Sequence, residues 1–428
     1  MKEIKIANIK DVAERQLCTG CGACAYISPE AIEMVNDYDF GKRPLLKNDN
    51  LAADQSAATL AVCPGIELKH TADAFDDPEL ISALAPAWGP VYEVWEGYAV
   101  DEMIRFSGSS GGAATALALY CIEKGGMYGV LHTQSKENAA LENETVISRN
   151  KEELLKGSGS RYAPASPCDG LQLLEAAPAP CVFVGKPCDV AAVQKVRKIR
   201  PLLDEKIGVA IAFFCAGTPS TKGTMELLKK LGIEDSTKVE SLRYRGKGWP
   251  GLWTVEYKDD HGNKLTRQVT YEESWGFLQK YRQWRCYICP DHTGEFADIA
   301  VGDPWYREIE QGEQGSSLIV ARTPLGKKMI HEAAAAGYIV LEKSDPQMLP
   351  LSQPNLLKAR GDLWGRLWGL KLMKAPYPKY QGFATYKFWL SELSLKEKIQ
   401  SIYGTVKRVF TKKLRQQMRV NNSNNSSN

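Results

Sequence analysis

The stretch CTGCGAC at residues 18–24 places three cysteines, Cys18, Cys21 and Cys24, with two residues between neighbours. Thiolates spaced in this way can face one metal centre, because a tight loop brings their sulfurs close together. The intervening glycines let the backbone wrap closely, so that amide N–H groups can point at the sulfurs. This pattern is typical of the opening of a bacterial ferredoxin motif and predicts a four-iron cluster.

The fourth ligand of this first set must come from elsewhere in the chain. In the usual run it would fall at residue 28, which is Ser28. We expect Cys63 to take its place, since a cysteine followed by proline, here Pro64, can ligate together with a distant trio. A four-cysteine zinc site is the alternative, although triplets with this spacing are unusual for zinc. Unliganded cysteines are less favoured still.

Four more of the eleven cysteines form a second candidate cluster site. Cys286 and Cys289 have two residues between them, whereas Cys188 and Cys215 each follow a predicted strand. Ligands of open α/β sheets gather at the carboxyl ends of strands, so these four thiols can share one site. The alternative is that Cys188 and Cys215 are buried apolar residues, as free cysteines often are. The remaining cysteines are expected in the core or near the surface: Cys121, Cys168 and Cys181.

Composition and charge exclude several classes of protein. The chain has 428 residues, 44% of them hydrophobic and 25% charged, and a net charge of +3, which is too balanced to indicate nucleic-acid binding. Residues 1–18 contain no apolar run, so they do not resemble a secretory signal. No apolar stretch approaches membrane-spanning length. We therefore expect a cytoplasmic protein, where clustered cysteines indicate metal binding or catalysis rather than disulfides.

The middle of the chain alternates between apolar strand patterns and amphipathic helix patterns, which predicts an α/β core. Between about 239 and 270 the pattern changes to short strands with a hairpin turn at Asp260–Asn263, so we expect a mixed sheet. The predicted strands are Met127–His132, Cys181–Val184, Val209–Phe214 and Asp298–Gly302. The predicted helices are Ala113–Glu123, Val190–Arg197 and Lys222–Leu231.

These patterns divide the chain into four predicted segments, in an α/β fold with α+β elements. Residues 1–72 form a ferredoxin-like 4Fe-4S domain, and residues 73–345 a mixed-sheet core with the second candidate cluster site, to which the family resemblance given below assigns flavin binding. Within the core segment, the proline-rich stretch 73–95 is expected to run over the surface. Residues 346–420 are an aromatic-rich and basic helical extension, and residues 421–428 a disordered polar tail.

A glycine- and serine-rich loop lies directly before the predicted helix at 113–123. Small residues at a helix N-terminus leave backbone N–H groups open to an anion, and the helix dipole favours a phosphate there. The chain contains no G-x-G-x-x-G in strand–helix context and no Walker A sequence. The further glycine-rich loops at 157–162 and 243–251 carry cations, although ordinary surface turns have the same composition. The candidate phosphate-binding residues are Ser107, Gly108, Ser109, Ser110, Gly111 and Gly112.

Together these segments resemble the coenzyme F420 hydrogenase/dehydrogenase beta-subunit family, which includes 7-hydroxymethyl chlorophyll a reductase. The resemblance covers about residues 15–305 and implies an oxidoreductase with FAD and two 4Fe-4S clusters. It assigns the loop at 107–112 to flavin binding and places Lys186, Arg161 and Asp303 in further matched motifs. The matching motifs, in chain order, are CTGCGAC, RFSGSSGG, GSRYAP, VGKPCDVAAV, FFCAG, RYRGKGWPG, CYICPD and DIAVGDPW.

The implied function is electron transfer between a ferredoxin-type donor and a small organic acceptor, through both clusters and FAD, in either direction. One alternative is a non-catalytic relay subunit of a larger hydrogenase or dehydrogenase complex that uses coenzyme F420. Another is a zinc-stapled binding module. A proton donor is also needed near the flavin, and His292, close to the second CxxC, is the candidate, although a lone histidine is more often a packed or surface residue.

The predicted helix Leu395–Val420 combines an apolar stripe with a basic flank. It fits a peripheral contact with an anionic membrane at the inner membrane face, or with an acidic ferredoxin. The alternative is a helix packed on the core with a solvated cationic face. The sequence is also compatible with a homo-oligomer. The stripe consists of Ile399, Ile402, Tyr403, Val406 and Phe410, beside Lys407, Arg408, Lys412, Lys413 and Arg415.

Overall fold

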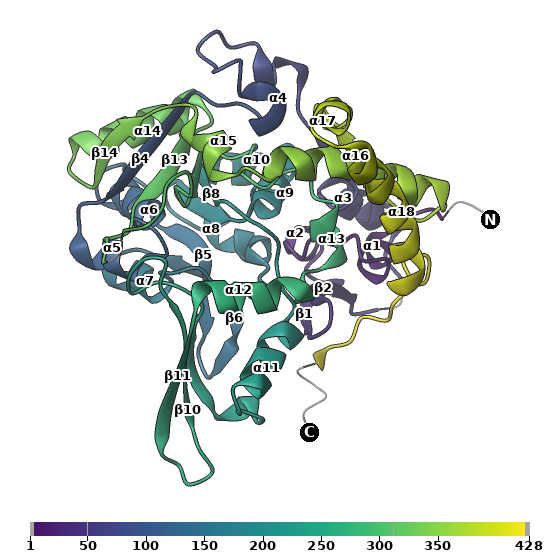
Figure 1. Cartoon of the computed structure of the whole chain (residues 1–428), viewed down its shortest axis with the longest axis horizontal. Coiled ribbons are helices and arrows are strands. Elements are labelled where there is room, and N and C mark those ends of the chain that lie inside the picture. Colours follow the sequence, from purple (N-terminus) through teal and green to yellow (C-terminus); the bar gives the residue numbers. More distant parts are fainter. Residues whose placement is uncertain (1–3, 49, 311, 424–428) are drawn as a thin grey trace.

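The computed structural model describes residues 4–48, 50–310 and 312–423. Its centre is an eight-stranded mixed sheet in the order β14-β4-β13-β12-β8-β7-β5-β6 (Figure 1). Strands β12, β8, β7 and β5 run parallel in the middle, and the outer neighbours pair antiparallel. The strands are β14 Ile339–Ser344, β4 Glu93–Ala99, β13 Ser317–Ala321, β12 Ile299–Gly302, β8 Ile207–Phe213, β7 Cys181–Gly185, β5 Val130–Lys136 and β6 Ala139–Ser148.

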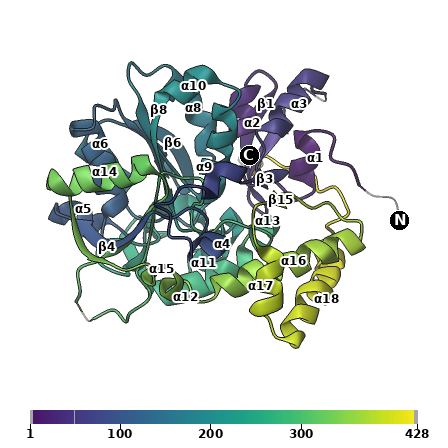
Figure 2. The same cartoon turned by 90° about the horizontal axis from the view of Figure 1, so that it is seen from above.

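Helices cover both faces of this sheet, which gives three layers (Figure 2). Successive side chains of a strand point to opposite faces. In β8, Val209 and Ile211 therefore pack beneath α6 and α14, whereas Ala210 and Ala212 pack beneath α9. The mixed α/β fold expected from the sequence is confirmed. The covering helices are α6 Ala113–Glu123 and α14 Pro324–Ala335 on one face, and α8 Leu171–Glu175, α9 Pro187–Arg197 and α10 Pro201–Lys206 on the other.

A second, three-stranded sheet in the order β11-β10-β9 extends away from the core in Figure 1. Its hairpin turn lies at residues 259–263, as the sequence predicts. Buried Trp253 and Val255 pack it against the neighbouring helices. These elements are β9 Val239–Arg243, β10 Leu252–Lys258, β11 Lys264–Thr270, α11 Thr221–Lys230, α12 Tyr271–Leu278 and the 3₁₀ turns η3 Ser236–Lys238 and η4 Gln279–Tyr281.

The N-terminal segment is joined to the other end of the chain. Strand β3 (Glu67–Lys69) pairs in parallel with β15 (Lys379–Gln381), so the two predicted terminal segments share a small sheet. The N-terminal segment also forms a hairpin of β1 and β2. Its elements are α1 Ile9–Glu14, α2 Ala23–Ile27, β1 Ile32–Asp37, β2 Gly41–Leu46, α3 Ala53–Ala61 and η1 Ala72–Phe75.

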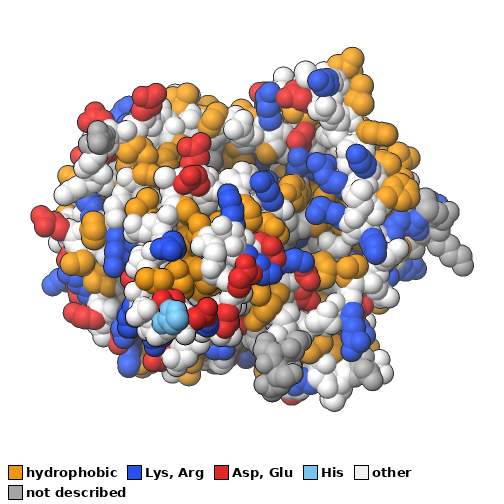
Figure 3. All heavy atoms as spheres, turned by 60° about the horizontal axis from the view of Figure 1, so that its bottom comes forward, with side chains coloured by type: hydrophobic (Ala, Val, Ile, Leu, Met, Phe, Trp, Pro, Cys, Tyr) orange, Lys and Arg blue, Asp and Glu red, His pale blue; other side chains and the backbone are white. Residues whose placement is uncertain are grey.

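Three helices of the C-terminal segment lie at the periphery in both cartoon views (Figures 1 and 2), and Figure 3 shows their exposed side at the upper right. The predicted helix from Leu395 ends at Thr411 rather than Val420, because Lys412 and Lys413 close its last turn onto the carbonyls of Arg408 and Phe410. The helices are α16 Leu356–Leu372, α17 Thr385–Ser391 and α18 Leu395–Thr411. Among the helices that the described residues form, none combines the length and the apolar character needed to cross a membrane.

Two expectations about local structure need correction. The stretch 73–95 is not only a surface linker, because it forms α4 (Ala85–Trp88), whose Trp88 is buried with Val91 in the main core. The strand predicted from Met127 begins at Val130, since the Met127 N–H instead donates to Cys121 and closes α6. The remaining short helices are α5 Glu102–Ser107, α7 Lys151–Lys156, η2 Pro167–Gly170, α13 Trp284–Tyr287 and α15 Met348–Ser352.

The polar tail predicted at 421–428 falls mostly outside the described residues. Its first part contacts the N-terminal hairpin: the Asn421 N–H donates to Asp37, and the Tyr38 N–H donates to the Ser423 hydroxyl at 3.1 Å. Residues 424–428 lie beyond the described part of the chain.

Candidate functional site

The structure brings together the first predicted cysteine set. Cys18, Cys21, Cys24 and Cys63 are all buried, between 6% and 7% exposed. Burial and the three neighbouring thiols raise the pKa of Cys24 well above its usual range. Burial and the same kind of proximity raise the pKa of Cys63 to about 12. The pKa of Cys18 is also raised, whereas Cys168 lowers that of Cys21, so three of the four thiols need a positively charged centre to become thiolates.

Backbone N–H groups point at the sulfurs of this set. The Gly20 N–H donates to the Cys18 sulfur at 3.3 Å, and the other three sulfurs each accept from a nearby amide. Gly20 and Gly22 both have positive φ, 79° and 92°, a conformation that favours glycine. A Cβ on Gly22 would lie 2.6 Å from the Asp169 nitrogen. The glycines of CTGCGAC therefore permit the tight wrap that the sequence predicts.

The second predicted set is also assembled, from three separate parts of the chain. Cys188 lies in the first turn of α9, Cys215 follows β8, and Cys286 and Cys289 lie in and just after α13. Burial raises the pKa of Cys215 to about 12, and the nearby Cys286 and Cys289 add to this effect. The Thr218 N–H donates to the Cys286 sulfur at 3.4 Å. Cys188 and Cys215 thus both lie beyond the carboxyl ends of parallel strands, β7 and β8.

A buried arginine, Arg285, lies between the two cysteine sets. It is 3% exposed and donates to the Pro64 carbonyl, which directly follows Cys63. Burial alone would lower the pKa of Arg285, but Tyr380 and the thiols of the second set raise it. The same guanidinium favours the thiolate of Cys18 in the first set. One positive charge thus acts on both sets at once.

The cysteines are free thiols throughout, and neither set fits a single ion. Within residues 4–48, 50–310 and 312–423, no group of three or more His, Cys, Asp or Glu side chains is arranged to hold one metal ion. A four-iron cluster is larger than one ion and contains its own sulfides, so its cysteines stand further apart. Buried, mutually coupled thiols that accept backbone N–H groups are a donor set that suits such a cluster.

A cavity of about 600 Å³ opens beside the second set, and Cys215 forms part of its wall. The glycine–serine loop before α6 lines the cavity through Gly108, Ser109, Ser110 and Gly112. The other two candidate loop residues, Gly111 and Ser107, do not line the cavity. The Gly111 N–H donates to the Ser317 hydroxyl at 2.9 Å, and Ser107 is the last residue of α5.

The close approach of backbones explains why this loop is rich in glycine. Gly112 caps α6 with φ of 73°, and a Cβ there would lie 2.7 Å from the Ile104 carbonyl oxygen. No side chain caps α6, so the first amides of the helix remain available at the cavity wall. The loop therefore combines a helix N-terminus with a cavity large enough for an organic ligand.

Asp303 belongs to a charged clamp at the same cavity. Its carboxylate accepts both terminal nitrogens of Arg245, at 2.8 and 2.9 Å, and the Trp249 indole N–H at 2.9 Å. Arg245 lies over the ring of Tyr271, with 4.5 Å from the guanidinium carbon to the ring centroid. Tyr271 in turn stacks on Trp305 with nearly parallel rings. The cavity thus has a flat aromatic side fixed by a bidentate ion pair.

Arg161 and Lys186 also line the cavity, but their charged groups are engaged with the protein. The Arg161 guanidinium donates to Asn143 and to the carbonyls of Leu242 and Ala140. The Lys186 ammonium donates to buried Asp189 at 2.6 Å, and this pair raises the pKa of Lys186 although burial alone would lower it. Arg161 therefore holds β6 and β9 together. The charge of Lys186 at the cavity wall is neutralised by Asp189.

His292 lies at the junction of the cavity and the second set. Its Nδ1 is 2.8 Å from the Cys215 carbonyl, which can only accept, so Nδ1 carries the proton. Burial lowers the pKa of His292 to about 4, although this hydrogen bond opposes the effect. In this neutral tautomer Nε2 has no proton and can accept a hydrogen bond. The lowered pKa keeps the ring neutral near neutral pH, and the role of His292 as an acid stays a prediction.

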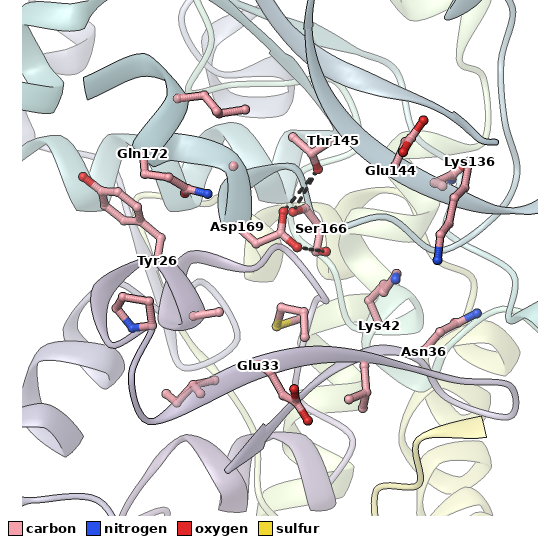
Figure 4. Close-up of a pocket in the computed structure, with 18 of the residues that line it drawn as sticks. Tyr26, Glu33, Asn36, Lys42, Lys136, Glu144, Thr145, Ser166, Asp169 and Gln172 are labelled. Carbon is pink, nitrogen blue, oxygen red and sulfur yellow. Dashed lines mark hydrogen bonds between the residues drawn. The ribbon is translucent and has the colours of Figure 1, made fainter. Parts of the chain in front are cut away.

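A second cavity, of about 780 Å³, lies between the N-terminal hairpin and the β5–β6 hairpin (Figure 4). On one side Asp169 accepts hydrogen bonds from Ser166 at 2.7 Å and from Thr145 at 3.2 Å. Lys42 and Lys136 also line it. Among the described residues, no cysteine lines this cavity, although Ala25 and Tyr26, which directly follow Cys24, form part of its wall.

Sequence reasoning missed four contributors to the site. Cys168 is completely buried beside Cys21, whose pKa it lowers, and its thiol donates to the Asp189 carbonyl at 3.5 Å. Arg285, Arg245 and Tyr271 reach the site from distant parts of the chain. Arg245 lies in the motif RYRGKGWPG, and Arg285 directly precedes CYICPD. The spacing within a motif does not show which of its side chains point into the site. Tyr271 lies in none of the recognised motifs.

The fold and the site agree with the comparison to known families. The N-terminal model of the coenzyme F420 hydrogenase/dehydrogenase beta subunit matches residues 94–172, and the C-terminal model of the same subunit matches residues 180–347. Together they cover more than half of the chain. The chain belongs to the coenzyme F420 hydrogenase/dehydrogenase beta-subunit family, as the motifs predicted.

Individual relatives are distant in sequence. An uncharacterized protein of Methanocaldococcus jannaschii is 23% identical over 80% of this chain and 94% of its own length. The F420-dependent formate dehydrogenase 1 subunit beta of Methanococcus maripaludis is 24% identical over 60% of this chain, and the coenzyme F420-dependent sulfite reductase of M. jannaschii is 24% identical over 75%. The chain spans 64% and 46% of these last two relatives.

A solved structure is similar to this chain at low sequence identity. One chain of the F420-reducing NiFe hydrogenase complex from Methanosarcina barkeri matches with 21% identity and a TM-score of 0.49. The match covers 78% of this chain and 98% of that one.

Proposed function

We propose that the chain is an iron–sulfur flavoprotein oxidoreductase. It passes electrons between a ferredoxin-type donor and a small organic acceptor by way of two 4Fe-4S clusters and FAD. The observation that carries this proposal is the position of Cys215. It belongs to the second cysteine set and also forms the wall of the cavity that the loop before α6 opens. A one-electron and a two-electron cofactor would therefore be neighbours.

Each group of residues around the cavity and the cysteine sets has its own role in this proposal. The two cysteine sets would hold the clusters, and the loop at 107–112 would receive the diphosphate through the amides of α6. The aromatic side around Tyr271 would face the flat ring system, with Arg245 held in place by Asp303. Bound there, FAD would link one-electron chemistry of the clusters to two-electron chemistry of the acceptor. His292 would accept a hydrogen bond at Nε2 from a group bound in the cavity.

The relatives' names support a deazaflavin as the first acceptor to test. Two of them are called F420-dependent, and the family takes its name from that coenzyme. The same names support the second candidate function, a relay subunit that works only inside a larger complex. The protein would be purified anaerobically, its iron, sulfide and flavin quantified, and turnover with reduced ferredoxin measured. Turnover by the isolated chain would exclude the relay function, and colourless protein without iron or flavin would exclude both.

Filling the cavity is expected to remove the flavin without removing the clusters. Ala114 lines the cavity at the start of α6, so Ala114→Phe would place a ring in the proposed ligand space. Overpacking of this kind costs about 1–3 kcal/mol, so flavin should bind about 5- to 150-fold more weakly. The matched control is Ala335→Phe on the exposed side of α14. Unchanged flavin affinity in Ala114→Phe, with iron retained, would contradict this placement.

Removing the charge between the cysteine sets is expected to lower the reduction potentials of both clusters. Reduction adds negative charge, which Arg285 stabilises from its position between the sets. Arg285→Gln should shift both midpoints downward by about 60 mV or more, a tenfold change in a one-electron equilibrium. Redox titration followed by electron paramagnetic resonance measures this shift. Arg285→Lys keeps the charge and should restore the potentials, whereas a purely structural role would give similar potentials in both variants.

A further inference from the structure

Helix α18 packs with the opposite face from the one expected of an amphipathic surface helix. Such helices normally bury their apolar stripe. In α18 the buried positions are Ser401, Thr405 and Val409. Most of its apolar side chains instead point outward, although Ile402 and Val406 are half-buried: Leu395 is 74% exposed, Ile399 58%, Tyr403 70% and Phe410 68%. We call these four side chains the C-terminal apolar face.

Glycines of the neighbouring helix explain how α18 packs without its apolar stripe. Gly365 and Gly369 lie one turn apart on α16, and small residues of α18 fit against them. A Cβ on Gly365 would overlap the Ser401 hydroxyl, and one on Gly369 would lie 3.0 Å from the Thr405 Cβ. The two helices therefore pack closely through small residues. The C-terminal apolar face takes no part in this packing, so the fold does not account for it.

Positive charge surrounds the C-terminal apolar face. Residues 385–420 contain nine lysines and arginines but only two glutamates, in a chain whose total net charge is +3. One of the glutamates, Glu397, is already paired with Lys358 and caps α18. Further exposed apolar side chains lie on the adjacent helices, among them Trp368 at 47% and Leu372 at 65%. Figure 3 shows hydrophobic and basic side chains interleaved at the upper right, where these helices lie.

We propose that the C-terminal apolar face docks on an anionic membrane surface, with α18 lying in the plane of the interface. An apolar stripe with lysines and arginines beside it is the pattern that binds the boundary between headgroups and acyl chains. Each basic residue near an anionic surface adds attraction, and tyrosine and tryptophan favour this depth. The 17 residues of α18 form a rod of about 25 Å. It is therefore long enough to lie flat on a bilayer with several turns in contact.

The charge argues against a second copy of this chain as the occupant. An isologous contact would place two strongly basic faces against each other, and like charges at an interface cost several kilocalories per mole. An acidic protein would also match the charge, so an acidic ferredoxin is included below as an alternative outcome. The aliphatic and aromatic side chains exposed along α18 fit a continuous apolar phase better.

The test is flotation of the intact, cofactor-loaded protein with lipid vesicles. Vesicles of phosphatidylcholine alone are compared with vesicles that also contain phosphatidylglycerol, at low and high salt. The protein should float with the anionic vesicles, and less so at high salt. The triple variant Ile399→Ser, Tyr403→Ser and Phe410→Ser should bind at least tenfold more weakly. Because these side chains are exposed, the variant should keep its fold, and its iron content checks this.

Two controls separate the proposal from its alternatives. Ile199→Ser with Leu202→Ser removes apolar side chains that are 45% and 50% exposed elsewhere, and flotation should not change. Lys407→Glu with Lys412→Glu should weaken binding to anionic vesicles. Absence of flotation, or equal flotation of the triple variant, overturns the proposal. So does a wild-type dimer, or a complex with an acidic ferredoxin, that the triple variant breaks while vesicle binding is absent.

Discussion

Replacing Cys24 with serine should halve the iron bound per chain, from about eight atoms to about four. Cys24 is buried among the other three thiols of the first set, and their proximity raises its pKa well above the usual range, after the larger effect of burial. A hydroxyl there ligates iron poorly, so the first cluster should be lost. The second set shares no residue with the first, and its cluster should remain. Iron and acid-labile sulfide per chain measure the result.

A reciprocal variant and a matched control make this test decisive. Cys289→Ser should remove the other half of the iron and leave the signal of the first cluster. Cys121→Ser replaces a buried cysteine of α6 that belongs to neither set, so the iron content should not change. Zinc in place of iron in the wild-type protein, or full iron in Cys24→Ser, would contradict the assignment of the first set.

Local sequence patterns predicted those parts of the molecule that short-range geometry determines. The helix at 113–123 matches α6 residue for residue, because glycines fix its beginning and its apolar pattern continues unbroken. The trio in CTGCGAC also depends only on a short loop. Cys63 was assigned to the first set because a proline follows it. Cys188 was assigned to the second set by the rule that ligands gather at strand ends.

The features that the sequence did not reveal depend on tertiary contacts. Arg285 and Cys168 reach the first cysteine set from far along the chain, and no spacing rule connects them to it. The stripe on α18 predicted an amphipathic helix, but periodicity does not say which face is buried. Glycines on α16 decide that, and their effect is visible only when both helices are placed. Trp88 is buried for a similar reason, since proline-rich composition indicates turns but not burial.

A buried carboxylate, Glu295, links three parts of the chain that the sequence suggests are separate. One oxygen is 2.8 Å from the His70 ring of the N-terminal segment, and the other accepts from Arg360 of α16. Glu295 itself lies in the core, where Arg322 is a further cationic neighbour. All four groups are almost completely buried. The cysteine sets contributed by different segments therefore keep their relative positions partly through this carboxylate.

Glu295→Gln should destabilise the whole protein by about 3–5 kcal/mol, because it leaves the buried Arg360 without its counter-charge. Urea unfolding followed by circular dichroism measures the free energy of unfolding. The control is Glu79→Gln, whose partner Lys327 is at the surface and whose loss should cost no more than about 1 kcal/mol. A loss below about 1 kcal/mol in Glu295→Gln would show that the three segments are held together by other contacts.

The pH dependence of the free energy of unfolding tests whether the charge of Glu295 stabilises the folded protein. Burial alone would raise the pKa of Glu295, but Arg360, His70 and Arg322 outweigh burial and lower it from 4.5 to about 2. A carboxyl with a lowered folded-state pKa stabilises the protein above its ordinary pKa, and this contribution is lost as the pH falls from about 4.5 towards 2. The free-energy difference between wild type and Glu295→Gln should therefore shrink as the pH falls from about 4.5 towards 2. Asp291, whose pKa burial and the neighbouring Glu295 raise to about 6, titrates above this window. A difference that stays constant down to about pH 3 would mean that the charge of Glu295 contributes nothing to stability.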